Sequence, residues 1–250
     1  MESSEIDPLM QHFQRYLGQI STSEKATACK RAFQRELLAL NAEPDFGRLD
    51  HEVSLELVEA NIDRTAHTLV TRGMSRRPMN VPPQVQLGVP DNFRFAELAL
   101  ALPFAWPLDE ASLAEPEHVW PLALLARLAQ FPFAKGTWLG VGHTVPNQEP
   151  PVAYHTSTAQ CCALIAPLVE IDEGFKQLRV SAGRRGADGA YQPGKLVSFY
   201  GVVPIYQDEL SFLLDKGPSD LLDRLETDRV SEEIAPARKS AVRKRKFWFF

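Results

Sequence analysis

Hydrophobic residues recur every three or four positions at the start of the chain, which is the spacing of a helix that buries one face. Asp7 and Pro8 precede the first such stripe, formed by Leu9, Phe13, Tyr16, Leu17 and Ile20. A second stripe follows, with Cys29, Phe33, Leu37 and Leu40. Asp is a good helix cap and Pro is favoured at the first helical position. The pattern predicts one helix from Pro8 and another from Glu24 to Leu40.

The hydrophobic period then changes to two, which is typical of strands with one buried face. In HEVSLELVEA the residues Val53, Leu55 and Leu57 alternate with polar positions and predict a strand over 51–60. FRFAELALALP alternates leucine with alanine, which also tolerates burial, and predicts a central strand that ends at Pro103. Further strands are predicted at 66–72 and within TWLGVGHTVP, AQCCALIAPL, FKQLRVS and KLVSFYGVVPIY.

Helical spacing returns in the middle and near the end of the chain. Residues 117–131 carry Trp120, Leu124, Leu125 and Leu128, with Pro121 expected in the first turn. DELSFLLDKG and LLDRLE predict two short helices separated by Gly217 and Pro218, and GRRGADGAYQPG predicts a hairpin connection. Antiparallel strand pairs mixed with helices indicate an α+β fold, a mixed and largely antiparallel sheet packed by helices.

Composition fits one large globular domain. The 250 residues are 44% hydrophobic and 24% charged, as in ordinary soluble proteins. MESSEIDPLM does not have the pattern of a secretory signal, and no window has the apolar length of a membrane span. The three cysteines, Cys29, Cys161 and Cys162, do not form a disulfide framework. A cytoplasmic location is therefore expected.

Charge is unevenly distributed along the chain. Residues 237–250 hold six Lys/Arg and no Asp/Glu, so residues 1–236 keep 21 basic against 32 acidic residues, a net charge of −11. An acidic body disfavours nucleic-acid binding by the folded part and favours a basic protein partner. Five interpretations of the KRKFWFF end stay open: contact with an anionic membrane surface, stacking on nucleic acid, docking on a partner, a disordered tail, or a tail that folds back onto the acidic body.

Catalytic and metal-binding patterns are weak. His143, His155, Cys161 and Cys162 do not have the spacing of a zinc site, and neighbouring cysteines of a strand point to opposite faces. A cysteine nucleophile with His143 as base stays open, as does a phosphate cradle at SAGRRGADG with Arg184 and Arg185. Asp208 and Glu209 open a predicted helix, where acids interact favourably with the helix dipole. We expect no cofactor, no metal and no enzymatic activity.

The order of several short motifs resembles the suppressor of fused family. The motifs are TLVTRGMSRRPM, FAELALALP, VWPLALLARLAQFP, WLGVGHTVPN, VPIYQDEL and GPSDLLDRL, and together they extend over residues 51–226. The resemblance implies a suppressor-of-fused-like domain at 51–226, a helical segment packed on it at 1–50 and a basic, aromatic tail at 227–250. The motif positions expected to be structural are Gly73, Met74, Glu97, Pro103, Gly142, Pro204, Tyr206 and Glu209.

The resemblance implies a protein-binding function. The animal member of the family holds zinc-finger transcription factors and grips an extended peptide partly by strand addition, whereas prokaryotic single-domain members are inferred to be immunity proteins that neutralise polymorphic toxins. The chain ends where the second domain of the animal protein would begin, so it resembles the prokaryotic form. We expect sequestration of a basic toxin; a regulatory scaffold and a cysteine/histidine-dependent enzyme are the alternatives. The candidate partner-binding residues are Thr71, Arg72, Ser75, Arg76, Arg77 and His143.

Overall fold

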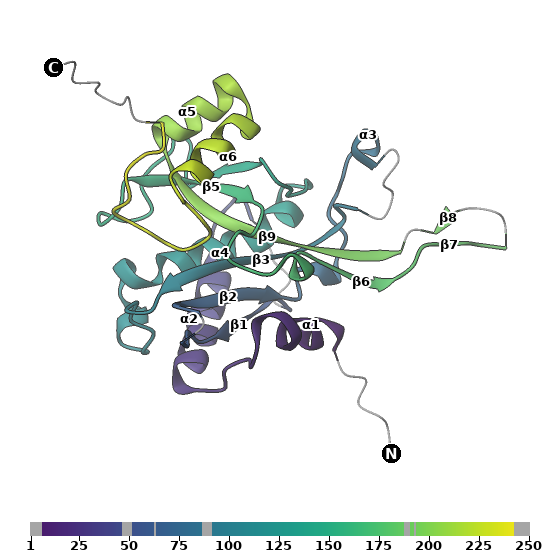
Figure 1. Ribbon diagram of the computed structural model, residues 1–250, viewed down its shortest axis with the longest axis horizontal. Helices are drawn as coiled ribbons and strands as arrows, with labels where there is room; N and C mark the ends of the chain where they lie inside the picture. The colour runs from purple at the N-terminus through teal and green to yellow at the C-terminus, as the bar shows by residue number, and fades with distance from the viewer. Residues whose placement is uncertain are drawn as a thin grey trace.

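A mixed, largely antiparallel sheet of seven strands runs through the molecule, with helices on both faces (Figure 1). The computed structural model describes residues 7–46, 52–62, 64–86, 92–187, 191–192 and 194–242. The strand order is β1-β2-β3-β9-β5-β4, and β6 also pairs with β9. The α+β fold predicted from the hydrophobic pattern is therefore confirmed.

Most strands lie within the predicted segments, but the strand predicted to precede the Gly-rich corner of TWLGVGHTVP is replaced by β4, which follows that corner. Their bounds are β1 (Ser54–Val58), β2 (Ala66–Arg72), β3 (Phe95–Pro103), β4 (Thr144–Pro146), β5 (Gln160–Ala166), β6 (Gln177–Ser181), β7 (Arg184–Arg185), β8 (Tyr191–Gln192) and β9 (Lys195–Tyr206). β3 lies in the middle of the sheet with seven consecutive buried residues, as the Leu/Ala alternation predicts. β3 and β9 are parallel, while the other pairs in this sheet are antiparallel.

Six α-helices and three 3-10 turns complete the described part of the chain. They are α1 (Pro8–Leu17), α2 (Glu24–Leu40), α3 (Pro83–Gln86), α4 (Pro116–Ala134), α5 (Gln207–Lys216), α6 (Pro218–Thr227), η1 (Met74–Arg76), η2 (Ser112–Ala114) and η3 (Glu173–Phe175). α2 has the predicted bounds, and Asp7 caps α1 through Leu9 N–H. α4 begins before the predicted start and continues past Pro132, with Pro121 beyond the first turn, because its buried packing outweighs the lost backbone bonds.

Alternating side chains of β9 assign the helices to the two faces of the sheet. Tyr200 and Val202 lie in the large core with α2 and α4. Val197 and Phe199 pack with α1, whereas Val203 and Ile205 pack with α5 and α6. On the second face, α1 and the α5–α6 pair therefore cover separate parts of the sheet.

The predicted hairpin connection forms an arm that projects from the body. β6 and the start of β9 pair, and beyond them β7 pairs with β8 through Arg184↔Gln192 and Arg185↔Tyr191 (Figure 1). The Arg184 guanidinium donates to Gln192 Oε1 at 3.0 Å. Arg184 is thus part of a hairpin. Residues 188 and 189 of the predicted phosphate cradle lie outside the described residues.

Candidate functional site

The TRGMSRR turn is built on one buried carboxylate. Glu97 is fully buried in β3 and accepts hydrogen bonds from Thr71 Oγ1 at 2.7 Å, Gly73 N at 2.9 Å and Ser75 N at 3.0 Å. Burial raises the pKa of Glu97, and these hydrogen bonds oppose the rise. Thr71 Oγ1 also accepts from Leu98 N at 2.9 Å. The Glu97 side chain on β3 thus holds the turn that follows β2 in place.

Gly73 is required where the chain leaves β2. Its φ is 114°, and a Cβ at this position would lie 2.5 Å from the carbonyl oxygen of Glu52. Left-handed backbone and close approach both favour glycine. Met74 then packs in the core with 1% exposure.

The predicted partner-binding residues of this turn separate into two groups. Thr71 and Ser75 are fully buried, so the prediction that their side chains offer donors to a partner is wrong. Arg72 is held by Glu56 at 2.7 Å and Asp7 at 3.4 Å. Arg76 pairs with Glu52 at the surface, and Arg77 lies 4.8 Å from the centroid of the Phe133 ring. A partner-binding role stays a prediction for the two surface arginines, Arg76 and Arg77.

The GVGHT motif forms a corner between α4 and β4. Gly142 has a φ of 89°, and a Cβ there would lie 2.8 Å from Pro218 Cβ at the start of α6. His143 Nδ1 lies 3.2 Å from the Trp138 carbonyl oxygen, and its ring meets the Trp138 ring edge-on at 4.3 Å. His143 therefore has a packing role at the corner.

The cysteine chemistry that the sequence left open is disfavoured by burial. Cys162 is fully buried, and burial raises the pKa of its thiol to about 12. Burial also raises the pKa of Cys161, and the nearby Asp208 and Glu209 carboxylates raise it further. Both environments disfavour the thiolate that a nucleophile needs. The described residues contain no cluster of three or more His, Cys, Asp or Glu side chains that could hold a metal ion.

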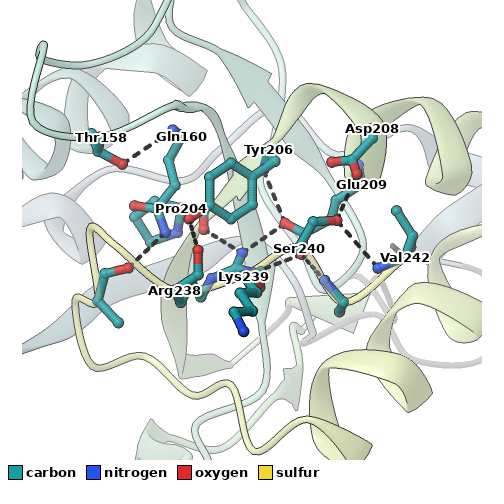
Figure 2. A network of polar contacts seen from close by, with 12 residues as sticks. Thr158, Gln160, Pro204, Tyr206, Asp208, Glu209, Arg238, Lys239, Ser240 and Val242 are labelled. Carbon is teal, nitrogen blue, oxygen red and sulfur yellow. Dashed lines mark hydrogen bonds and ion pairs between the residues drawn. The ribbon is translucent and has the colours of Figure 1, made fainter. Parts of the chain in front are cut away.

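Residues 228–242, here called the strap, are fastened to the body by a buried ion pair. Arg238 Nη1 and Nη2 lie 2.6 and 2.7 Å from the two carboxylate oxygens of Glu209, and these side chains are 10% and 0% exposed. Arg238 Nη2 also donates to the Pro204 carbonyl at 2.9 Å, and its guanidinium stacks 4.7 Å from the Tyr206 ring centroid (Figure 2). The Tyr206 hydroxyl donates to the Arg238 carbonyl.

The VPIYQDEL motif is explained by this arrangement. Pro204 lies beyond the last residue of β9 that pairs with β3, and its carbonyl accepts from Arg238. Glu209 also accepts from Tyr206 N and Ala241 N. The helix-dipole interpretation therefore describes only part of the motif, because Glu209 is the buried partner of Arg238.

The strap also extends the sheet. Glu233 forms a parallel bridge with Ala101, where Ala101 N donates to Glu232 O at 2.9 Å and Ile234 N donates to Ala101 O at 2.8 Å. Ile234 is fully buried in the large core. The side chains of Thr158 and Gln160 donate to the Pro236 and Ala235 carbonyls (Figure 2).

A pocket of about 400 Å³ opens between the strap, the end of α1 and the face of β2 and β3. Four acidic residues line it, and we call it the acidic pocket: Glu170, Asp172, Glu232 and Glu233. Glu232 is structural, since its carboxylate accepts from Val169 N and Glu170 N. Burial raises the pKa of Glu233, and the Glu170 and Glu232 carboxylates raise it further. Negative charge is thus concentrated at the pocket, and a cation bound there would relieve the repulsion.

Sequence reasoning found the motif turns but missed the acidic pocket. Its acids come from the loop after β5 and from the strap, which are about 60 residues apart in the chain. Only the excess of acidic residues in the body pointed to such a surface. The aromatic end, residues 247–250, lies outside the described residues.

Comparison with known protein families matches residues 51–239 to the family described as suppressor of fused protein (SUFU). No curated protein matches the chain. None of the helices in the described residues has both the length and the hydropathy to cross a membrane.

Three solved structures are similar, each with a TM-score of 0.47. A chain of the Sufu–Fu complex crystal structure is 16% identical, over 84% of this chain and 91% of that one. Drosophila Suppressor of Fused is 17% identical, over 76% of this chain and 42% of that one. A SUFU homologue from Neisseria gonorrhoeae is 15% identical, over 86% of this chain and 100% of that one.

Proposed function

This chain belongs to the suppressor of fused family, and from that premise we propose that it is a non-enzymatic protein-binding module with a basic protein as its partner. In eukaryotes the domain of this family is a protein-interaction module. The acidic pocket is the observation that supports a basic partner, because Glu233 is partly buried there beside two further carboxylates. Lysine or arginine side chains of the partner complement this charge.

The net charge of the body supports the same partner chemistry over longer distances. Residues 1–236 carry a net charge of −11, which attracts a positively charged protein before contact. More specifically, we propose that the partner is a basic toxin, and that this chain neutralises the toxin by covering the toxin's active surface. A regulatory scaffold for an endogenous basic protein uses the same contacts, so the identity of the partner separates these two forms.

The test is capture of partners by three tagged proteins: the unchanged chain, E170Q/E233Q and D223N/E226Q. The first variant removes two charges at the acidic pocket, and the second removes two charges from the exposed side of α6. We expect one basic protein to be retained by the unchanged chain and by D223N/E226Q, and to be lost from E170Q/E233Q. Equal retention by both variants contradicts the role of the pocket.

The neighbouring genes and the toxicity of the captured protein distinguish toxin neutralisation from a regulatory scaffold. If the captured protein is encoded nearby and is toxic when produced alone, co-production of this chain should restore growth. A captured protein that is harmless alone contradicts toxin neutralisation and favours the scaffold.

A further inference from the structure

The arm that is formed by β6, β7, β8 and the start of β9 has a defined direction. The register of the β6–β9 pair shifts between Arg179 and Ser181, and an irregularity of this kind bends a strand pair. Lys195 N donates to Ser181 Oγ at 3.0 Å, and a Cβ at Gly194 would lie 2.4 Å from the Ser181 carbonyl oxygen. The two strands therefore cross closely at the bend, and the β7–β8 ladder continues the arm away from the body (Figure 1).

The arm is positively charged, whereas the body that carries it is negatively charged. Residues 177–195 contain four Lys/Arg and one Asp, a net charge of +3. The remainder of residues 1–236 contains 17 basic against 31 acidic residues, a net charge of −14. The side chains of Arg179, Arg184 and Arg185 are exposed. The arm is thus a basic surface that projects from an acidic protein.

Neutral groups surround three of the cations on the arm and at its base. The Arg184 guanidinium donates to the amide oxygen of Gln192. Lys195 Nζ lies 5.3 Å and the Arg94 guanidinium carbon 5.7 Å from the centroid of the Phe95 ring. Neither an amide nor an aromatic ring cancels a positive charge. These cations therefore keep their charge for a negatively charged surface.

The acidic pocket has the complementary charge, but it lies at the other end of the sheet. The arm leaves the sheet where β9 pairs with Phe95 at the start of β3, whereas Ala101 near the end of β3 lines the pocket. Six residues of a strand separate these points by about 20 Å. Because the paired strands direct the arm away from the body (Figure 1), the acidic pocket that it meets belongs to another molecule.

The charge of the whole molecule favours a second copy over nucleic acid as the partner of the arm. A two-stranded ribbon also fits a groove of duplex DNA. However, the net charge of −14 on the rest of residues 1–236 repels the phosphate backbone. A second copy instead presents carboxylates in a pocket of about 400 Å³, and arginine pairs well with carboxylates.

We propose that the arm of one molecule docks at the acidic pocket of a second copy, so that its exposed arginines meet the pocket carboxylates. This inference goes beyond the proposed function, because it concerns two copies of the chain in the absence of any other protein. The arm occupies the pocket to which the basic partner is proposed to bind. A basic partner therefore competes with the arm, and weakly binding proteins are kept out of the pocket.

The experiment is sedimentation velocity of the full chain at low and high salt, beside R184E/R185E and K25E/R31E. Both variants change the net charge equally, but Lys25 and Arg31 are exposed residues of α2, on the opposite face of the sheet from the pocket. We expect salt-sensitive self-association of the unchanged chain and of K25E/R31E. R184E/R185E should associate at least about tenfold more weakly, because attractive contacts become repulsive. A monomeric unchanged chain, or equal association of all three proteins, overturns the inference.

A charge swap separates docking from a folding defect. E170R/E233R reverses two charges of the acidic pocket and should not self-associate. Mixed with R184E/R185E, it should form a complex, because each arm then meets a pocket of opposite charge. Circular dichroism checks that the variants are folded, and E170R, which changes one exposed position, replaces the double variant if that protein does not fold. A mixture of folded variants that stays monomeric overturns the inference.

Two further results distinguish the inference from its alternatives. A monomeric chain that binds a labelled DNA duplex, when R184E/R185E does not, would assign the arm to nucleic acid and overturn docking on a second copy. If the unchanged chain is monomeric while E170Q/E233Q loses the captured basic partner, the proposed function stands and the inference is wrong. If the charge swap restores association while E170Q/E233Q retains the partner, the inference stands and the proposed function is wrong.

Discussion

Replacing Arg238 by alanine should destabilise the protein far more than replacing an exposed arginine. R238A removes the contacts at 2.6 and 2.7 Å to Glu209, the hydrogen bond to the Pro204 carbonyl and the stacking on Tyr206. Glu209 is fully buried, and its remaining donors are the N–H group of Tyr206 at the end of β9 and the N–H group of Ala241 in the strap. Removing one partner of a buried ion pair costs about 3–5 kcal/mol.

The matched control is R31A, because Arg31 and Glu110 form an ion pair whose side chains are 67% and 73% exposed. Exposed pairs contribute about 0–1 kcal/mol. The free energy of unfolding is measured by urea titration followed by far-UV circular dichroism, and an E209A/R238A double mutant gives the coupling energy. We expect coupling of at least about 2 kcal/mol. A loss below about 1 kcal/mol in R238A, equal to that in R31A, would refute the fastening role of the pair.

Three further predictions concern the turn and the cysteines. E97A should lose about 2–4 kcal/mol because Gly73 N and Ser75 N lose their acceptor, whereas E97Q keeps an acceptor. The folded-state pKa of Glu97 is raised above the ordinary 4.5, so the folded state holds the Glu97 proton more tightly than the unfolded state does. The unchanged chain should therefore lose stability relative to E97Q as the pH rises above 4.5, and urea titrations at mildly acidic and mildly alkaline pH measure this loss. G73A should cost more than G18A in the same assay, because both glycines have positive φ but only Gly73 lies against a carbonyl; equal losses would contradict the steric argument. Iodoacetamide should modify Cys162 only in denaturant, as followed by mass spectrometry, and C161A/C162A should retain the captured partner; loss of function in a folded double variant would favour the cysteine enzyme.

The periodic segments were predictable because local packing determines them. The hydrophobic stripe through Phe33 and Leu37 predicted the bounds of α2, and the Leu/Ala alternation of β3 predicted a central strand. Parallel pairing of β3 with β9 was not predictable, since strand partners about 100 residues apart leave no local pattern. Tertiary packing also carried α4 through Pro132, where the sequence predicted an earlier end.

The candidate site was less predictable than the fold for the same reason. Glu209 and Arg238 are joined across 29 residues, and each alone resembles an ordinary surface charge in the sequence. Thr71 and Ser75 look like exposed donors beside two arginines, yet both are buried because they surround Glu97.

The measurement that tests the central claim most directly is isothermal titration of the captured partner into the unchanged chain, E170Q/E233Q and D223N/E226Q at several salt concentrations. We expect a one-to-one complex whose affinity falls with salt. E170Q/E233Q should bind at least about tenfold more weakly, and D223N/E226Q should match the unchanged chain. Equal affinity in all three proteins, without salt dependence, would contradict recognition of a basic partner at the acidic pocket.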